Sequence, residues 1–247
     1  VSLQALFEGT QEMGLFENPH TLQDIAYIMC RGGWPGSLNL DRDAALDVAV
    51  NLVDEIVNTD VNRVDGIERN PDRVRAVLRS YARNISTMTT ANTIMGDVRA
   101  NDISITDKTL SNYLTALRRL FIIEDVKAWQ PSLRSRTGIR TSDKRHFVDT
   151  SIATAILELS PKSALEDFEL FGFLFEDFCL RDIRVYTELL RGTVYHYHDN
   201  SNLESDLIIR LHDGRWAAIE VKTGSREIED ASKNLIKLAN EVDTSKI

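Results

Sequence analysis

The spacing of the apolar residues changes along this chain, and that change most limits what the chain can fold into. Up to about residue 120 the apolar residues recur at helical spacing. In the segment 42–58, one face of the expected helix collects Ala45, Val48, Ala49, Leu52, Val53 and Ile56. Beyond residue 184 come short apolar runs that are typical of strands. The sequence therefore predicts a mixed α and α/β fold, helical at first and with a sheet near the end.

The first 70 residues are predicted to form a helical segment. The spacing of apolar residues places helices near 3–15, 22–30 and 42–58. Between the second and third of these, Arg31–Gly36 is too rich in glycine and proline for a helix. We expect a tight loop there, with Trp34 packed beneath it.

Residues 71–148 are predicted to form a winged helix-turn-helix. Three helices are expected, beginning near Pro71, Thr90 and Thr106. A β-rich run at Phe121–Val126, a basic loop and a returning strand at Phe147–Val148 then complete the wing. Winged helices bind DNA, but they also serve as interaction modules between proteins or domains, so this element leaves both roles open.

The DNA-binding interpretation names particular side chains. The helix 108–120 is the expected recognition helix, and the basic loop is the expected wing, because phosphate contacts need Lys or Arg and base contacts need polar side chains. The candidate DNA-binding residues are Lys108, Asn112, Arg118, Arg119, Arg134, Arg136 and Arg140.

The distribution of charge is compatible with this interpretation. The whole chain has a net charge of −9, yet residues 71–140 hold 12 basic and 6 acidic residues, a net charge of +6. Residues 141–247 hold 13 basic and 20 acidic residues, a net charge of −7. A basic segment between acidic ones can attract a phosphate backbone. The basic segment can equally pack against the acidic segments that precede and follow it in the sequence.

Residues 149–247 are predicted to form an α/β domain that carries a metal site. A helix is expected at 165–183 and another at 225–240. Strands are expected at 185–189, 194–198, 206–211 and 216–221. Asp213-Gly214 is a strong signal for a hairpin turn between the last two strands.

That hairpin would bring Asp206 close to Glu220, and Lys222 would share a strand face with Glu220 because side chains alternate along a strand. Two carboxylates can bind Mg²⁺, and Lys222 can orient a water molecule or neutralise developing charge. These side chains suit metal-dependent cleavage of phosphodiesters, with Asp206 and Glu220 as metal ligands and Glu204 as a possible substitute ligand. The alternative is an ordinary ion pair between Glu220 and Lys222 on an edge strand.

The order of these residues resembles the PD-(D/E)xK nuclease superfamily, with Glu176 on a helix, Asp206 on a strand and Glu220-x-Lys222 after a hairpin. The resemblance implies a restriction-endonuclease-like fold and catalytic roles for Glu176, Asp206, Glu220 and Lys222, with Glu176 completing or orienting the site. Ser205 stands where the superfamily often has proline.

A wider resemblance covers nearly the whole chain. The loop Arg31–Pro35, the blocks 80–85 and 109–114, the segment 147–150 and the strands 204–209 and 219–222 resemble predicted bacterial and archaeal AAA-type ATPases that carry a C-terminal domain of unknown function. This implies that residues 1–70 are a remnant of an ATPase lid, and it predicts a nuclease-like domain that is truncated at its C-terminus. No G-x-x-x-x-G-K-[ST] phosphate loop occurs in the sequence, so ATP is expected to bind only in a missing N-terminal domain.

Several classes of protein are excluded or disfavoured by composition. The chain is 43% hydrophobic and 27% charged, which is ordinary for a globular protein, and no apolar run is long enough to cross a membrane. Cys30 and Cys179 lack metal-ligand spacing, so a reducing cytoplasmic setting is expected.

The leading hypothesis is therefore the DNA-interacting C-terminal module of an AAA-type ATPase, with DNA and its own or a partner ATPase domain as partners. The alternative is a non-catalytic interaction or regulatory module. The oligomeric state stays open.

Overall fold

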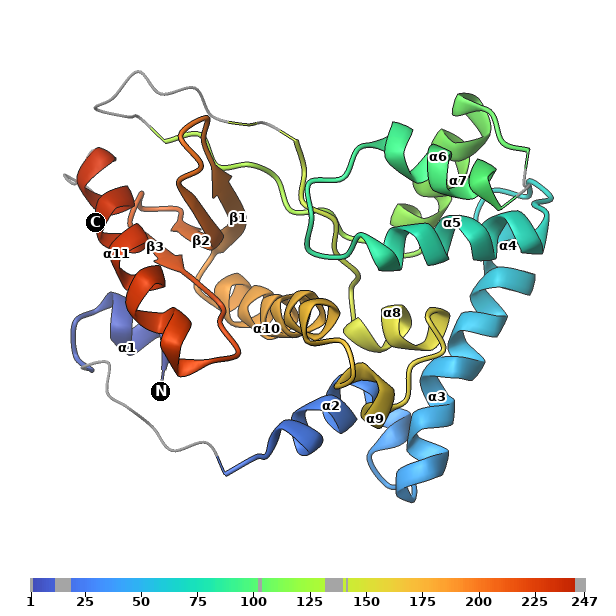
Figure 1. Ribbon diagram of the computed structural model, residues 1–247, viewed down its shortest axis with the longest axis horizontal. Coiled ribbons are helices and arrows are strands. Elements are labelled where there is room, and N and C mark those ends of the chain that lie inside the picture. Colours follow the sequence, from blue (N-terminus) through green and yellow to red (C-terminus); the bar gives the residue numbers. More distant parts are fainter. Residues whose placement is uncertain (1, 12–18, 102–103, 132–139, 141, 243–247) are drawn as a thin grey trace. The chain divides into compact units, whose positions relative to one another are not determined.

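The computed structural model describes residues 2–11, 19–101, 104–131, 140 and 142–242 (Figure 1). The chain divides into two compact units. The first unit comprises Val1–Pro19, Val126–Asp143 and Cys179–Ile247, and the second comprises His20–Asp125 and Lys144–Phe178. The predicted boundaries after residues 70 and 148 both fall inside the second unit.

The second unit is helical. Its helices are α2 (Leu22–Arg31), the 3₁₀ turn Pro35–Ser37, α3 (Arg42–Glu55), the π-helical turn Ile56–Asp60, α4 (Val61–Arg63), α5 (Pro71–Arg83), α6 (Ala91–Ala100), α7 (Asp107–Arg119), α8 (Thr150–Ile156) and α9 (Pro161–Ala164). The first part of α10 (Phe168–Leu189) also belongs to it.

The predicted helix starts in the second unit are confirmed by their caps. Asn70, Thr90 and Thr106 each accept a hydrogen bond from the backbone N–H three residues on, which satisfies a donor that the first turn leaves free. The apolar face of each helix then enters one core, whose largest fully buried side chains include Met29, Ile56, Leu78, Tyr81, Ile85, Ile94, Leu117, Phe147, Ile152 and Phe171.

The Arg31–Gly36 loop is held by the start of α8. The backbone N–H of Gly33 donates to Asp149 Oδ2 at 2.9 Å, and Trp34 Nε1 donates to Ser151 Oγ at 2.8 Å. At Gly32 the φ angle is +75°, and a Cβ there would lie 2.4 Å from Ser151 Oγ. Glycine is therefore needed at this position, because both the backbone conformation and the space exclude a side chain.

The predicted wing is much shorter than expected. The runs 121–126 and 147–148 form a single antiparallel bridge between Ile123 and Phe147 instead of two strands. It is flanked by hydrogen bonds from Glu124 N to His146 O and from Val148 N to Ile122 O. The chain leaves the second unit after Asp125 and returns at Lys144. Val126 and Lys144 are themselves bridge residues, but neither belongs to a strand. Three helices and isolated bridges are what the described residues retain of the predicted winged helix, which stays a prediction.

The first unit contains a small sheet. Its strands are β1 (Gly192–His198), β2 (Glu204–Leu211) and β3 (Trp216–Ile219), and its helices are α1 (Leu3–Phe7), the end of α10 and α11 (Ser225–Glu241). In the described part of the chain the three strands are antiparallel in the order β1-β2-β3. The hairpin predicted at Asp213-Gly214 is confirmed, with Gly214 at a φ of +92° and Arg210 paired with Trp216.

One predicted strand is wrong. Val185–Leu189 forms the last turns of α10, not a strand. Its apolar residues Val185 and Leu189 are exposed, while Leu180 and Thr187 are buried. The buried positions thus follow helical spacing, and the contacts of Leu180 with the sheet residue Leu207 outweigh the local β-propensity of the segment.

The sheet of the first unit is covered by α11 and by an aromatic cluster. Leu238 of α11 packs with Ile208 of β2 and with Trp216, and the ring centroids of Trp129 and Trp216 lie 4.7 Å apart. The mixed helical and α/β architecture is therefore confirmed, whereas the nuclease fold stays a prediction. No helix among the described residues has the length and apolar character that crossing a membrane requires.

Candidate functional site

The structure brings three of the four predicted catalytic residues together in the first unit. Lys222 Nζ lies 2.7 Å from Glu220 Oε2 and 3.5 Å from Asp206 Oδ2. The three side chains are 29%, 4% and 11% exposed, in the order Lys222, Glu220 and Asp206. The two carboxylates therefore lie almost out of water and share one ammonium group.

The register of the sheet explains why these residues meet. Leu207 of β2 pairs with Ile219 of β3, so the preceding residue Asp206 and the following residue Glu220 are neighbours at the same end of the ladder. The backbone N–H of Val221 donates to Asp206 Oδ2 at 3.0 Å. Ser205 Oγ lies 3.1 Å from Ile219 O, which links the residue before each carboxylate to the other strand.

Burial and charge change the protonation of this group. Burial, followed by the negative charge of Asp206, raises the pKa of Glu220 to about 7 although Lys222 opposes the rise. Burial disfavours the charge of Lys222, but its hydrogen bond to Glu220 and the charge of Asp206 outweigh this and raise the pKa of Lys222. Near neutral pH, Glu220 therefore exchanges a proton while Lys222 stays charged.

The donor set is compatible with a divalent cation. Glu220 Oε1 is buried and has no hydrogen-bond partner in the described structure, so an acceptor is available beside Asp206. No group of three or more His, Cys, Asp or Glu side chains able to hold a metal occurs among the described residues. The two carboxylates fit Mg²⁺ even so, because Mg²⁺ in proteins is often held by one or two carboxylates, with waters and substrate phosphates filling its remaining positions.

Glu176 and Glu204 have other surroundings. Glu176 belongs to the second unit, where its carboxylate lies 2.6 Å from Lys144 Nζ and 3.9 Å from His146 Nε2. Glu204 opens β2 with a side chain that is 56% exposed, 3.9 Å from His198 Nδ1. The interaction of Glu176 with Lys144 was missed from the sequence, because two residues 32 positions apart give no pattern that pairs them.

The predicted recognition helix α7 has one buried and one exposed face. Leu110, Leu114 and Leu117 enter the core of the second unit. Lys108, Asn112 and Arg119 are exposed, and their spacing of four and seven residues places them along one face. This exposed face is polar and basic.

Arg118, a predicted DNA-binding residue, is engaged in an ion pair, and its contact with DNA stays a prediction. Its guanidinium binds Asp125, with 2.6 Å between Nη2 and Oδ2. Asp125 also accepts hydrogen bonds from Tyr81 and Arg145. Burial alone would raise the pKa of Asp125, but the hydrogen bonds from Tyr81 and Arg118 outweigh it and lower that pKa. Arg118 thus belongs to a cluster that fastens α5 and α7 to the bridge segments.

The predicted wing residues are only partly described. Arg134 and Arg136 lie outside the described residues. Arg140 lies in the first unit, where its backbone N–H donates to His198 O at 2.8 Å and its Nη2 to Asn202 Oδ1 at 3.0 Å.

Comparison with known proteins assigns most of the chain to one family. Residues 22–163, more than half of the chain, match the domain of unknown function DUF8612. The chain belongs to the DUF8612 family. Residues 171–247 match a second domain of unknown function, DUF4143. No curated protein and no solved structure matches the chain.

The two matches divide the candidate residues between them. The DUF8612 match contains the Arg31–Gly36 loop and helix α7. The DUF4143 match contains Asp206, Glu220 and Lys222, and also Glu176. The exposed face of α7 and the carboxylate site therefore belong to different family domains.

Proposed function

We propose that this chain interacts with nucleic acid and that its Asp206, Glu220 and Lys222 cleave phosphodiesters with the help of Mg²⁺. The observation that carries the proposal is the convergence of the three side chains at one end of the β2–β3 ladder, with a buried Glu220 oxygen to which no described residue donates a hydrogen bond.

Each residue has a role that its position supports. Asp206 and Glu220 would hold the cation, which would acidify a water molecule and offset charge on the phosphate. Asp206 is already fixed by the backbone N–H of Val221, so little reorganisation is needed. Lys222 holds its proton and can neutralise charge that develops on the phosphate oxygens. Because the pKa of Glu220 is about 7, the site is expected to become competent as Glu220 loses its proton.

The contact with nucleic acid is proposed for the exposed face of α7. Lys108 and Arg119 would contact phosphates, and Asn112 between them would reach a base edge. Arg134, Arg136 and Arg140 from the basic loop remain candidates for further phosphate contacts.

Association with an AAA-type ATPase is a further part of the proposal. DUF4143 is a domain often found in AAA-ATPase-associated proteins. Since the sequence contains no phosphate loop, ATP would be bound by a separate domain or by a partner protein. We place this activity in the cytoplasm, in line with two cysteines that form no disulfide in the structure described.

One observation favours a non-catalytic alternative. Lys222 already neutralises part of the charge of both carboxylates, so the three groups satisfy one another without a metal. In that case the site would stabilise an interaction or regulatory module, whose acidic surface repels DNA.

Plasmid cleavage separates the two candidates. Supercoiled plasmid is incubated with the full chain and Mg²⁺ or Mn²⁺, and with the variants Asp206→Asn and Lys222→Met. Asp213→Asn is the matched control, because Asp213 is an exposed carboxylate paired with Arg215 in the turn of the same β2–β3 hairpin, at the end opposite the site. We expect nicking by the wild type and the control only. Absence of nicking by the wild type in both metals would contradict the nuclease proposal and favour the alternative.

A further inference from the structure

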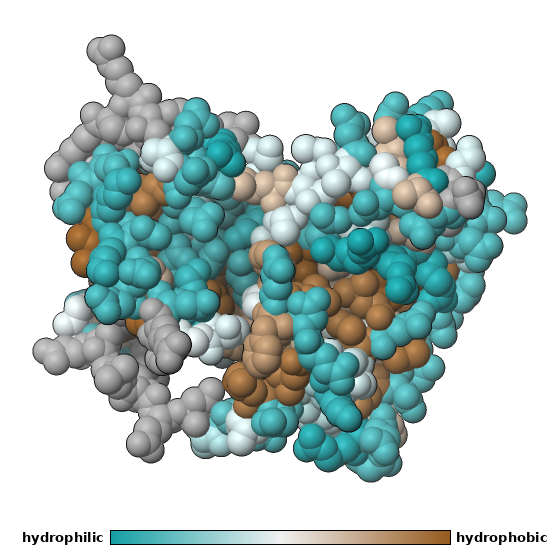
Figure 2. Space-filling view, viewed as in Figure 1, coloured by the Kyte–Doolittle hydropathy of each residue, from teal (hydrophilic) through white to brown (hydrophobic). Residues whose placement is uncertain are grey.

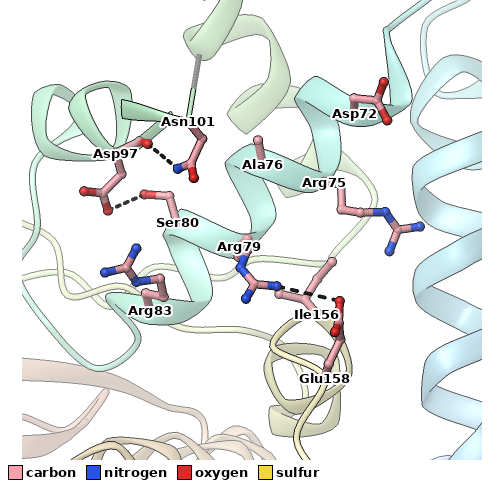
Figure 3. A pocket seen from close by; sticks show the side chains of 10 residues that line it. All are labelled: Asp72, Arg75, Ala76, Arg79, Ser80, Arg83, Asp97, Asn101, Ile156 and Glu158. Atoms are coloured by element: carbon pink, nitrogen blue, oxygen red, sulfur yellow. Dashed lines mark hydrogen bonds and ion pairs between the residues drawn. The ribbon is translucent and has the colours of Figure 1, made fainter. Parts of the chain in front are cut away.

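A cavity of about 260 Å³ lies in the second unit, on a face of α5 that the proposed function does not use. Arg75, Arg79 and Arg83 line it, and they follow one another at intervals of four residues (Figure 3). Side chains four apart on a helix share a face, so three guanidinium groups form one row. In Figure 2 the surface over α5 is hydrophilic and adjoins apolar surface near α8.

The row is incompletely neutralised. Arg75 forms a 2.8 Å ion pair with Asp54, but Arg79 lies 3.7 Å from Glu158, which is 83% exposed. The side chain of Arg83 makes no hydrogen bond or ion pair with another described residue, and Figure 3 draws none. Like charges four residues apart on a helix repel each other, so this arrangement costs stability unless an anion compensates it.

The acidic residues at the cavity do not fill this need. Asp97 accepts hydrogen bonds from Ser80 Oγ at 2.9 Å and from Asn84 Nδ2 at 3.3 Å, so its carboxylate is directed to neutral partners. Asp72 lies in the first turn of α5, at the other end of the row from Arg83 (Figure 3). Only Glu158 competes for Arg79, and it does so through a long, exposed contact.

We propose that this cavity binds a phosphate group through Arg79 and Arg83, with Glu158 displaced from Arg79 as the ligand enters. A guanidinium presents two parallel N–H donors that match two oxygens of one phosphate. The volume suits a phosphate and part of its ester, since it lies just below the range of about 300–1,000 Å³ found for pockets that enclose whole drug-sized ligands. The phosphate can come from a free nucleotide or from a nucleic-acid backbone, and the chemistry of the contact is the same.

The test uses the full chain with three probes: pyrophosphate, adenosine monophosphate and a fluorescein-labelled DNA duplex. Arg83→Ala is expected to weaken binding about tenfold, because a hydrogen bond between charged groups is lost. Arg83→Lys is expected to recover only part of the affinity, since lysine restores the positive charge but not the two parallel N–H donors of a guanidinium. The control is Arg63→Ala, an arginine of α4 that is 73% exposed and lies outside this cavity.

The variant Glu158→Gln separates phosphate binding at this cavity from a purely structural role of its residues. Removal of the competing carboxylate is expected to raise phosphate affinity several-fold, with thermal stability unchanged. If calorimetry shows that pyrophosphate and adenosine monophosphate bind, and that Arg83→Ala weakens their binding, the phosphate group comes from a free small molecule. If Arg83→Ala weakens only the binding of the duplex, as measured by fluorescence anisotropy, the phosphate group comes from the nucleic-acid backbone.

The inference is overturned if no probe responds to Arg83→Ala, or if Arg63→Ala has the same effect. Cleavage by the Asp206 site is measured separately, so failure of this inference and failure of the proposed function are distinguishable.

Discussion

The pKa of Glu220 makes the stability of the protein depend on pH in a defined direction. The folded state raises this pKa from the ordinary value of 4.5 to about 7. A carboxyl group with a raised pKa contributes stability that is fully present below its unfolded pKa and is lost as the pH rises through its folded pKa. Between these two values, at about 1.4 kcal/mol per pKa unit, the free energy of unfolding falls by at most about 3 kcal/mol.

The variant Glu220→Gln removes this titration while it keeps the size of the side chain. We expect the variant to gain stability relative to the wild type as the pH rises from about 5 to about 8, by up to about 3 kcal/mol. Urea unfolding of both proteins at each pH measures this difference. Mg²⁺ added at the higher pH should restore part of the stability of the wild type, and of the wild type only, because a ligand stabilises the state that binds it.

The result that refutes this reasoning is a stability difference between Glu220→Gln and the wild type that does not change with pH. Such a result would mean that the carboxyl group of Glu220 titrates in the folded protein as it does in the unfolded chain. The charge of Asp206 would then have no effect on the pKa of Glu220, and the two carboxylates would not form one site.

Four further substitutions have expected outcomes. Asp125→Ala leaves the buried hydroxyl of Tyr81 without its carboxylate partner, and we expect a loss of about 3 kcal/mol in urea unfolding. Gly32→Ala forces a side chain onto a backbone with a φ of +75°, and about 1–3 kcal/mol should be lost in the same assay. Arg119→Ala should weaken DNA binding and lower the salt slope by about one, whereas Arg118→Ala should act mainly on stability.

Each of these outcomes can be contradicted. Full stability of either destabilised variant would show that the contact assigned to it is not made in solution. DNA affinity that is independent of salt, or unchanged by Arg119→Ala, would remove α7 from the proposed nucleic-acid surface.

The local parts of the fold could be predicted from the sequence because their causes are local. Helix starts follow from the caps Asn70, Thr90 and Thr106, which satisfy free backbone donors. The hairpin follows from Asp213-Gly214, since only a residue such as glycine easily adopts the positive φ that the turn requires. The meeting of Asp206 with Glu220 then follows from the hairpin and the alternation of side chains.

The parts that could not be predicted depend on contacts between distant residues. Val185–Leu189 has the composition of a strand, yet it continues a helix whose buried residues pack on the sheet. The wing reduces to isolated bridges, and the chain crosses between the two units within it. Glu176 is paired with Lys144, and no spacing along the sequence indicates this.

The central claim is that Asp206 and Glu220 form a divalent metal site beside Lys222, and titration with Mn²⁺ tests it most directly. Electron paramagnetic resonance of free Mn²⁺ at about pH 8, above the pKa of Glu220, counts the ions that the chain binds. The account predicts one bound ion that is lost in Asp206→Asn and kept in Asp213→Asn. No bound ion in the wild type, or one that Asp206→Asn does not remove, would contradict it.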